Sequence, residues 1–120
     1  MLHMSNTLIW LDDMRNPFTN NFLEKFSPVN AYTCYVVWLK SYDEFKNWID
    51  KNGLPKAICF DNDLGDIEKT GYDCAKYLVE FCMNNDCDIP KFGIQSSNVP
   101  GSNNISGILS SYHKFYRETH

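Results

Sequence analysis

Residues 58–65, Ile-Cys-Phe-Asp-Asn-Asp-Leu-Gly, form a short apolar run that ends abruptly in two carboxylates and a glycine. An unbroken apolar run of this kind is typical of a strand that is buried on both faces, as in a parallel sheet. In an open α/β sheet, the residues just beyond the carboxyl end of such a strand face the ligand crevice. We therefore expect a functional site at Asp61 and Asp63.

Two other apolar runs end in polar groups in the same way. Residues 7–11 (TLIWL) are followed by Asp12 and Asp13, and residues 92–94 (FGI) are followed by the polar segment 95–98 (QSSN). If these three strands lie side by side, their carboxyl ends meet at one edge of the sheet. Four aspartates and a cluster of hydroxyls would then converge there.

Strands and helices alternate along the chain, which predicts parallel βαβ units and an open, doubly wound sheet of about four strands. Strands are predicted at 7–11, at 31–39, from 56 or 57 to 60, and at 92–94. A short or irregular helix is predicted within 18–30. Two better-defined helices follow: the first is capped by Ser41 and Glu44 and ended by Gly53 and Pro55, and the second is capped by Thr70 and Asp73 and ended by residues 84–86. The last helix begins at Asn103 or Asn104, and its apolar stripe consists of Ile105, Ile108, Leu109, Tyr112 and Phe115.

The bulk composition predicts one globular domain that spans residues 1–120, with 43% hydrophobic and 22% charged residues. A net charge of -4 disfavours general attraction to nucleic acid or to an anionic membrane. We expect a cytoplasmic location, because no stretch is long enough to span a bilayer and the first residues lack the features of a secretory signal. The five cysteines are expected to be reduced, since several lie in apolar segments.

Four neighbouring carboxylates would repel one another strongly unless a cation neutralised them. Oxygen-only ligands suit a hard ion, so Mg²⁺ (or Mn²⁺) is expected, with phosphorus chemistry as its natural use. Ser96, Ser97 and Asn98 offer donors for phosphate oxygens. Arg15 either binds the same phosphate through two donors of its guanidinium group or forms one half of a surface ion pair. Each aspartate taken alone could instead cap a helix or face solvent.

Four short motifs in this order resemble the receiver domain of two-component response regulators, and within that superfamily its cyclic-phosphate-processing branch. They are 11–17 (LDDMRNP), 61–65 (DNDLG), 70–73 (TGYD) and 96–98 (SSN). The resemblance implies a flavodoxin-like three-layer sandwich with strand order 2-1-3-4 and helices on both faces. It also implies a divalent metal in the acidic pocket.

The resemblance further implies roles for individual residues. Asp13 and Asp61 would bind the metal directly, Asp12 would act through water, and Asp63 would contribute by its backbone or side chain. Catalysis would involve Asp61 and Ser96. Substrate contacts would come from five residues: Arg15, Asn62, Gln95, Ser97 and Asn98.

Two departures from the family pattern bear on function. The chain ends without the fifth strand and its lysine, which disfavours phosphotransfer signalling. The branch also usually has histidines where Asn62 and Gln95 stand, and an amide cannot move a proton at neutral pH. The three histidines, at positions 3, 113 and 120, are expected to be solvated or structural.

Three functions are therefore open. The first is metal-dependent processing of a cyclic phosphate in a nucleotide or at a nucleic-acid end. The second is a module that binds a phosphate ligand, a cyclic nucleotide or a protein partner without turnover. The third is a phosphoaspartate switch at Asp61. We expect a phosphate-containing partner and no membrane.

Overall fold

The computed structural model describes residues 6–65 and 68–120. Within these ranges four strands form one parallel sheet in the order β2-β1-β3-β4. The strands are β1 (Thr7–Leu11), β2 (Tyr35–Leu39), β3 (Ala57–Phe60) and β4 (Lys91–Ile94). The strand order expected from the family resemblance, 2-1-3-4, is confirmed.

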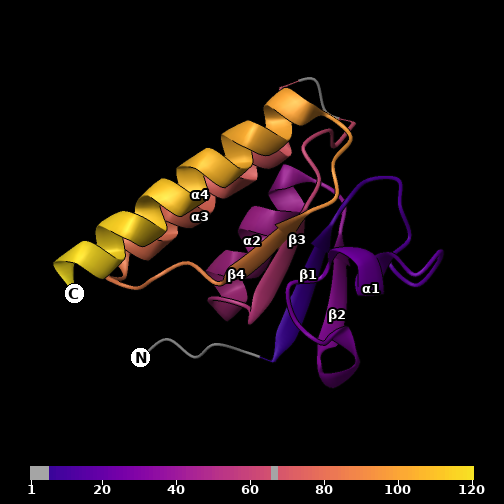
Figure 1. The fold of residues 1–120 in the computed structure, drawn as a ribbon, viewed down its shortest axis with the longest axis horizontal. Coiled ribbons are helices and arrows are strands. Elements are labelled where there is room, and N and C mark those ends of the chain that lie inside the picture. Colours follow the sequence, from indigo (N-terminus) through magenta and orange to yellow (C-terminus); the bar gives the residue numbers. More distant parts are fainter. Residues whose placement is uncertain (1–5, 66–67) are drawn as a thin grey trace.

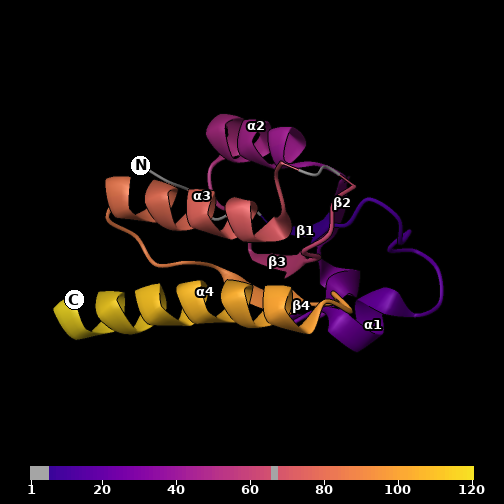
Figure 2. The same ribbon diagram turned by 90° about the horizontal axis from the view of Figure 1, so that it is seen from above.

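Helices cover both faces of this sheet, as expected. The helices α2 (Tyr42–Asn52), α3 (Gly71–Asn84) and α4 (Val99–Thr119) lie on one face, and the short helix α1 (Phe22–Phe26) lies on the other (Figures 1 and 2). Figure 1 shows α3 and α4 running side by side. The three layers make the flavodoxin-like α/β sandwich.

The alternation of side chains along β1 and β3 fills two separate cores. Ile9, Leu11, Ile58 and Phe60 belong to the core beneath α2, α3 and α4. The residues between them, among them Trp10 and Cys59, belong to the core beneath α1. Because side chains change face at every residue, Asp12 and Asp61 fall on the α1 face of the sheet.

The cap signals read from the sequence start α2 and α3 where predicted. The Ser41 hydroxyl accepts a hydrogen bond from the Glu44 amide at 3.1 Å. The Thr70 hydroxyl accepts one from the Asp73 amide at 3.4 Å, and the Asp73 carboxylate accepts the Thr70 amide at 2.8 Å. Both caps satisfy amide groups that the first helical turn leaves without intrahelical partners.

The second strand is shorter than predicted. It begins at Tyr35 rather than Ala31, because Ala31–Thr33 forms a 3₁₀ helix. The Asn30 side chain accepts a hydrogen bond from the Tyr32 amide at 3.0 Å. Asparagine commonly closes turns of this kind, and here its local bond wins over the β propensity of the following residues.

The last helix begins at Val99, several residues before the predicted start at Asn103 or Asn104. Asn98 caps it, since its side-chain oxygen accepts the Gly101 amide at 2.8 Å. The proline in the first turn is tolerated because the amide that it lacks would have no helical partner there. Phe115, predicted on the buried stripe, is 57% exposed.

All five cysteines are free, as expected, and Cys59, Cys74 and Cys82 are buried. Burial raises the pKa of the Cys59 thiol to about 12, which keeps it protonated. Within the described ranges, none of the helices has both the length and the apolar composition needed to cross a membrane. His3, one of the three histidines of the sequence analysis, lies outside the described residues.

Candidate metal centre

Three carboxylates converge at the carboxyl edge of the sheet. Leu11 of β1 is the register partner of Phe60 of β3, so Asp12 and Asp61 are the next residues on two adjacent strands. The ladder continues through them, because the Asp61 amide donates to the Leu11 carbonyl at 3.0 Å. Asp12, Asp13 and Asp61 each place one carboxylate oxygen within 4.8 Å of the others.

Asp12 is fully buried and held by its own loop. Its Oδ1 accepts the amides of Met14 at 2.9 Å and Arg15 at 2.8 Å. Its Oδ2 lies 3.4 Å from Nη1 of Arg15. The Trp38 indole donates to the Asp12 carbonyl at 2.6 Å. One carboxylate oxygen is therefore committed to shaping the loop, and the other remains with a single, long contact.

Asp13 is partly buried and lies against Gly65. Gly65 has φ +71, and a Cβ atom there would come within 2.8 Å of Oδ2 of Asp13. A glycine tolerates both this left-handed backbone and this close approach. The sequence analysis gave Gly65 no role of its own, although a glycine that ends an acidic motif was the available signal.

Asp61 is only 7% exposed. Its burial, followed by the charge of Asp12, raises the pKa of its carboxyl group to about 6, while hydrogen bonds from the Ser96 hydroxyl and the Asp63 amide oppose that shift. Burial therefore disfavours the ionised form of Asp61 relative to that of a carboxyl group in water. Ser96, predicted to be catalytic, contacts Asp61 directly.

The starts of α3 and α4 pack against the segment that follows β3. A Cβ atom on Gly71 would lie 1.9 Å from the Asp61 carbonyl oxygen, and one on Gly101 would lie 2.4 Å from Nδ2 of Asn62. The Asn62 side chain accepts the Tyr72 amide at 3.2 Å. Asn62, predicted to contact substrate, is thus a buried packing residue between two helix starts.

Asp63 and Asn98 occupy the rim of the site. Asp63 is exposed and stands outside the group of three carboxylates. Nδ2 of Asn98 lies 3.3 and 3.5 Å from the two carboxylate oxygens of Asp63. Ser97 is exposed on the same rim, so the predicted donors of the segment after β4 do reach this edge.

An open pocket of about 350 Å³ lies over the carboxylates. Met14, which is 80% exposed, belongs to its lining and was not singled out from the sequence. No pattern in the sequence distinguishes this methionine from an ordinary loop residue. The pocket is lined by eight residues: Asp12, Asp13, Met14, Arg15, Asp61, Asp63, Gly65 and Ser97.

Arg15 ties the loop after β1 to the end of β4. Its Nη1 donates to the Gln95 carbonyl at 2.9 Å as well as contacting Asp12. Its other guanidinium donors make no hydrogen bond to the part of the chain that the structure describes, and the residue lines the pocket. Arg15 can therefore hold the loop and still present a positive charge to a bound anion.

Gln95 is not among the residues that line the pocket. It is 4% exposed, and its Nε2 donates to the Leu11 carbonyl at 3.0 Å. The residue predicted to contact substrate is thus buried beside the carboxylates.

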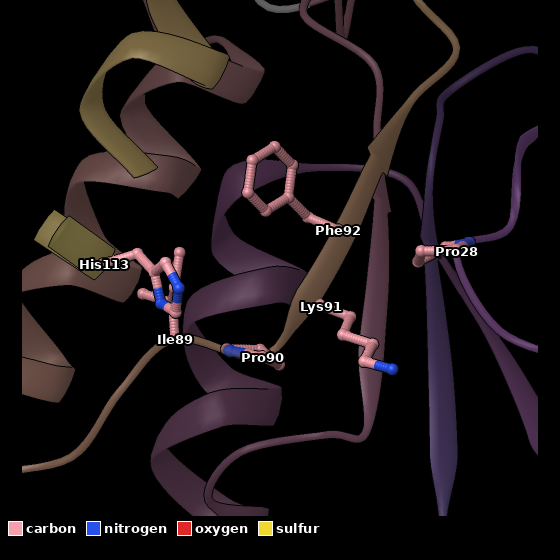
Figure 3. A pocket seen from close by; sticks show the side chains of 6 residues that line it. All are labelled: Pro28, Ile89, Pro90, Lys91, Phe92 and His113. Carbon is pink, nitrogen blue, oxygen red and sulfur yellow. The ribbon is translucent and has the colours of Figure 1, made fainter. Parts of the chain in front are cut away.

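A second hollow, of about 280 Å³, lies at the opposite end of β4 (Figure 3). Its lining includes Pro28 on one side of the strand and Phe92 and His113 on the other. His113 is half exposed, and its Nδ1 lies 2.8 Å from Oδ2 of Asp88. This histidine therefore joins α4 to the segment before β4. The hollow holds no group of carboxylates, and the metal centre remains the better candidate site.

Comparison with known sequences supplies the family. The model of the cyclic-phosphate processing receiver domain matches residues 7–111, a span that contains all the residues of the metal centre. Neither the curated proteins nor the solved structures give a match. The match covers most of the chain, and the chain belongs to the family of cyclic-phosphate processing receiver domains.

Proposed function

We propose that this domain uses a divalent metal ion to process a cyclic phosphate, carried by a nucleotide or by a nucleic-acid end. The observation that carries the proposal is the convergence of Asp12, Asp13 and Asp61 within 4.8 Å beneath an open pocket. The family to which the chain belongs is named for the same chemistry.

The donor set fits Mg²⁺ or Mn²⁺. Such ions prefer carboxylate oxygens and keep positions open for water and a substrate phosphate. Two of the three carboxylates are buried, where a bound cation would offset the cost of burying their charge. When bound, the ion would supply a Lewis acid for a phosphoryl oxygen.

The reaction is the hydrolytic opening of a cyclic phosphodiester. A water oxygen adds to phosphorus, one ring P–O bond breaks, and the departing oxygen takes a proton, which leaves a phosphomonoester and a free hydroxyl. Arg15 and Ser97, which line the pocket, would bind the phosphate oxygens. Ser96 would hold the Asp61 carboxylate in place through its hydroxyl hydrogen bond.

The test is incubation with Mg²⁺ or Mn²⁺, and separately with EDTA, in the presence of cyclic nucleotides and oligonucleotides that end in a cyclic phosphate. Chromatography and ³¹P NMR would detect the ring-opened product. We expect metal-dependent turnover that Asp61→Ala abolishes. Glu80→Gln, which removes one negative charge from the exposed surface of α3, should leave turnover unchanged.

Absence of turnover across the whole panel, or full turnover in Asp61→Ala, would contradict the proposal. Metal-independent turnover would do so as well.

A second candidate is binding without turnover. It is favoured by one observation: the lining of the pocket contains no histidine among the described residues, and both amides at the family's histidine positions are buried. Calorimetry would then give saturable, metal-dependent binding of a cyclic nucleotide that is recovered unchanged. Recovery of ring-opened product would exclude this candidate.

A further inference from the structure

Gln95 has an unsatisfied oxygen. Among the described residues, its Oε1 is the one buried side-chain polar atom that has no hydrogen-bond partner. Leaving a buried acceptor unpaired costs about 1–3 kcal/mol. Such a group in a folded protein calls for a partner that lies outside the protein itself.

The register of the sheet places Gln95 in the same row as two of the carboxylates. Ile94 is the partner of Phe60, and the Gln95 amide donates to the Phe60 carbonyl at 2.9 Å, so the ladder continues past the end of β4. Gln95 therefore stands beside Asp61, which in turn stands beside Asp12.

The three side chains also share one face of the sheet. Gly93, two residues before Gln95, faces the α1 layer, since a Cβ atom on it would lie 2.3 Å from the Phe26 carbonyl oxygen. Alternate residues of a strand point the same way, so Gln95 faces the α1 layer too. Asp12 and Asp61 point to that face for the same reason.

The Gln95 side chain spans β3 to reach β1. Its Nε2 donates to the Leu11 carbonyl at 3.0 Å, and the Asp61 amide donates to the same carbonyl at 3.0 Å. The opposite amide orientation would set two oxygens against each other, which fixes the assignment. Oε1 belongs to the same planar amide, so it lies on the face of the sheet that Asp12 and Asp61 share.

The missing partner must be a hydrogen-bond donor of small size. Asp12 and Asp61 contribute carboxylate oxygens, which are acceptors, and Nη1 of Arg15 donates to the main-chain carbonyl of Gln95 instead. An exposure of 4% leaves no access for a bulky ligand, so the donor has to be of the size of a water molecule. Divalent ions held by a few carboxylates bring several waters with them.

We propose that Oε1 of Gln95 accepts a hydrogen bond from a water molecule that enters with the metal ion, which makes Gln95 a positioning residue of the metal centre. This inference rests on the proposed function, because it requires that the three aspartates bind an ion. It assigns to the glutamine a task that needs no proton transfer.

The test compares Gln95→Met with Gln95→Glu. Methionine keeps the length of the side chain but removes both the Oε1 acceptor and the Nε2 donor, whereas glutamate loses only the donor and keeps an acceptor oxygen. We expect Gln95→Met to weaken Mg²⁺ affinity about tenfold or more, as loss of groups that support metal ligands does. Gln95→Glu should bind Mg²⁺ at least as well as the wild type.

Affinity for Mg²⁺ alone is measured by calorimetry, and urea unfolding in EDTA reports the stability of each metal-free variant. Metal-free Gln95→Met should be about as stable as the wild type, since removal of the unpaired oxygen offsets loss of the hydrogen bond from Nε2 to the Leu11 carbonyl. The control is Thr7→Val, which changes a buried polar residue at the far end of β1. This variant should bind Mg²⁺ with the affinity of the wild type.

The outcomes separate the two proposals. A wild type that binds no divalent ion overturns the proposed function. A wild type that binds Mg²⁺ while Gln95→Met binds equally well overturns the role of Gln95 alone. If Gln95→Met fails to fold, Gln95→Glu decides, because an affinity below that of the wild type would show that only the Nε2 bridge matters.

Discussion

At the scale of single residues, the carboxylates of the metal centre are held in different ways. Backbone amides of its own loop hold the Asp12 side chain. Asp61 is buried and accepts a hydrogen bond from the Ser96 hydroxyl. Asp13 occupies the space that a side chain at Gly65 would fill. These differences determine which substitutions disturb charge and which disturb geometry.

The raised pKa of Asp61 predicts a pH dependence of stability in the metal-free protein. The folded-state pKa of about 6 exceeds the reference value of 3.8, so this group stabilises the fold below the reference pKa and loses that contribution as the pH rises through the folded value. The difference corresponds to at most about 3 kcal/mol.

The measurement is urea unfolding in EDTA between about pH 4 and pH 7 for the wild type and for Asp61→Asn. The wild type should lose stability relative to the variant over this interval. Parallel stability curves for the two proteins would show that Asp61 titrates normally.

Gly65→Ala should distort the metal centre. The alanine Cβ would strike Oδ2 of Asp13, and the left-handed backbone disfavours any side chain by about 1 kcal/mol or more. We expect both lower stability and weaker Mg²⁺ binding by calorimetry. Gly107→Ala is the matched control, because a Cβ there meets nothing within 4 Å and should stabilise α4 by about 0.5–1 kcal/mol without changing Mg²⁺ affinity.

At the scale of elements, the site is made where strands end and helices begin. The ends of β1 and β3 supply the carboxylates, and the starts of α3 and α4 press against Asp61 and Asn62 through Gly71 and Gly101. The first turn of each helix therefore packs against the segment that carries Asp61 and limits its movement.

Gly71→Ala should separate α3 from this segment. The new methyl group would overlap the Asp61 carbonyl, which is backbone and cannot rotate away. Overpacking of this kind typically costs about 1–3 kcal/mol. Thermal unfolding should show the loss, and Thr70→Ser, which keeps the capping hydroxyl of α3, should not. A Gly71→Ala protein as stable as the wild type would contradict the close contact.

At the scale of the whole molecule, the cluster of Asp12, Asp13 and Asp61 links both halves of the chain. It joins β1 and β3, and Arg15 extends the link to the end of β4. An ion bound there favours the folded state, because the unfolded chain does not hold the three aspartates together.

Mg²⁺ should therefore stabilise the protein against unfolding, by about 2.7 kcal/mol at a concentration of 100 times the Kd. Thermal melts across a Mg²⁺ series would measure this. Asp13→Asn should lose most of the stabilisation, while Asp43→Asn, an exposed residue of α2, should keep it. An unfolding temperature that does not respond to Mg²⁺ in the wild type would contradict metal binding.

Local sequence signals predicted the strands and helices that supply the residues of the site. Apolar runs located β1, β3 and β4, cap residues located the starts of α2 and α3, and the polar residues after each strand located the edge where the carboxylates meet. Where one local signal competed with another, as with the turn at Asn30 and the cap at Asn98, the prediction of the element boundary was wrong.

The sequence by itself determined that Asp12, Asp13 and Asp61 each follow directly on a buried strand, because an apolar run and the polar residues that end it lie within a few residues of one another. Only the tertiary structure decided that Asn62 is buried against Gly101 and that Asp63 stays on the rim. It alone joined the Gln95 side chain to the Leu11 carbonyl and left Oε1 without a partner. Those facts depend on contacts between residues far apart in the chain, and no local pattern encodes the packing that makes them.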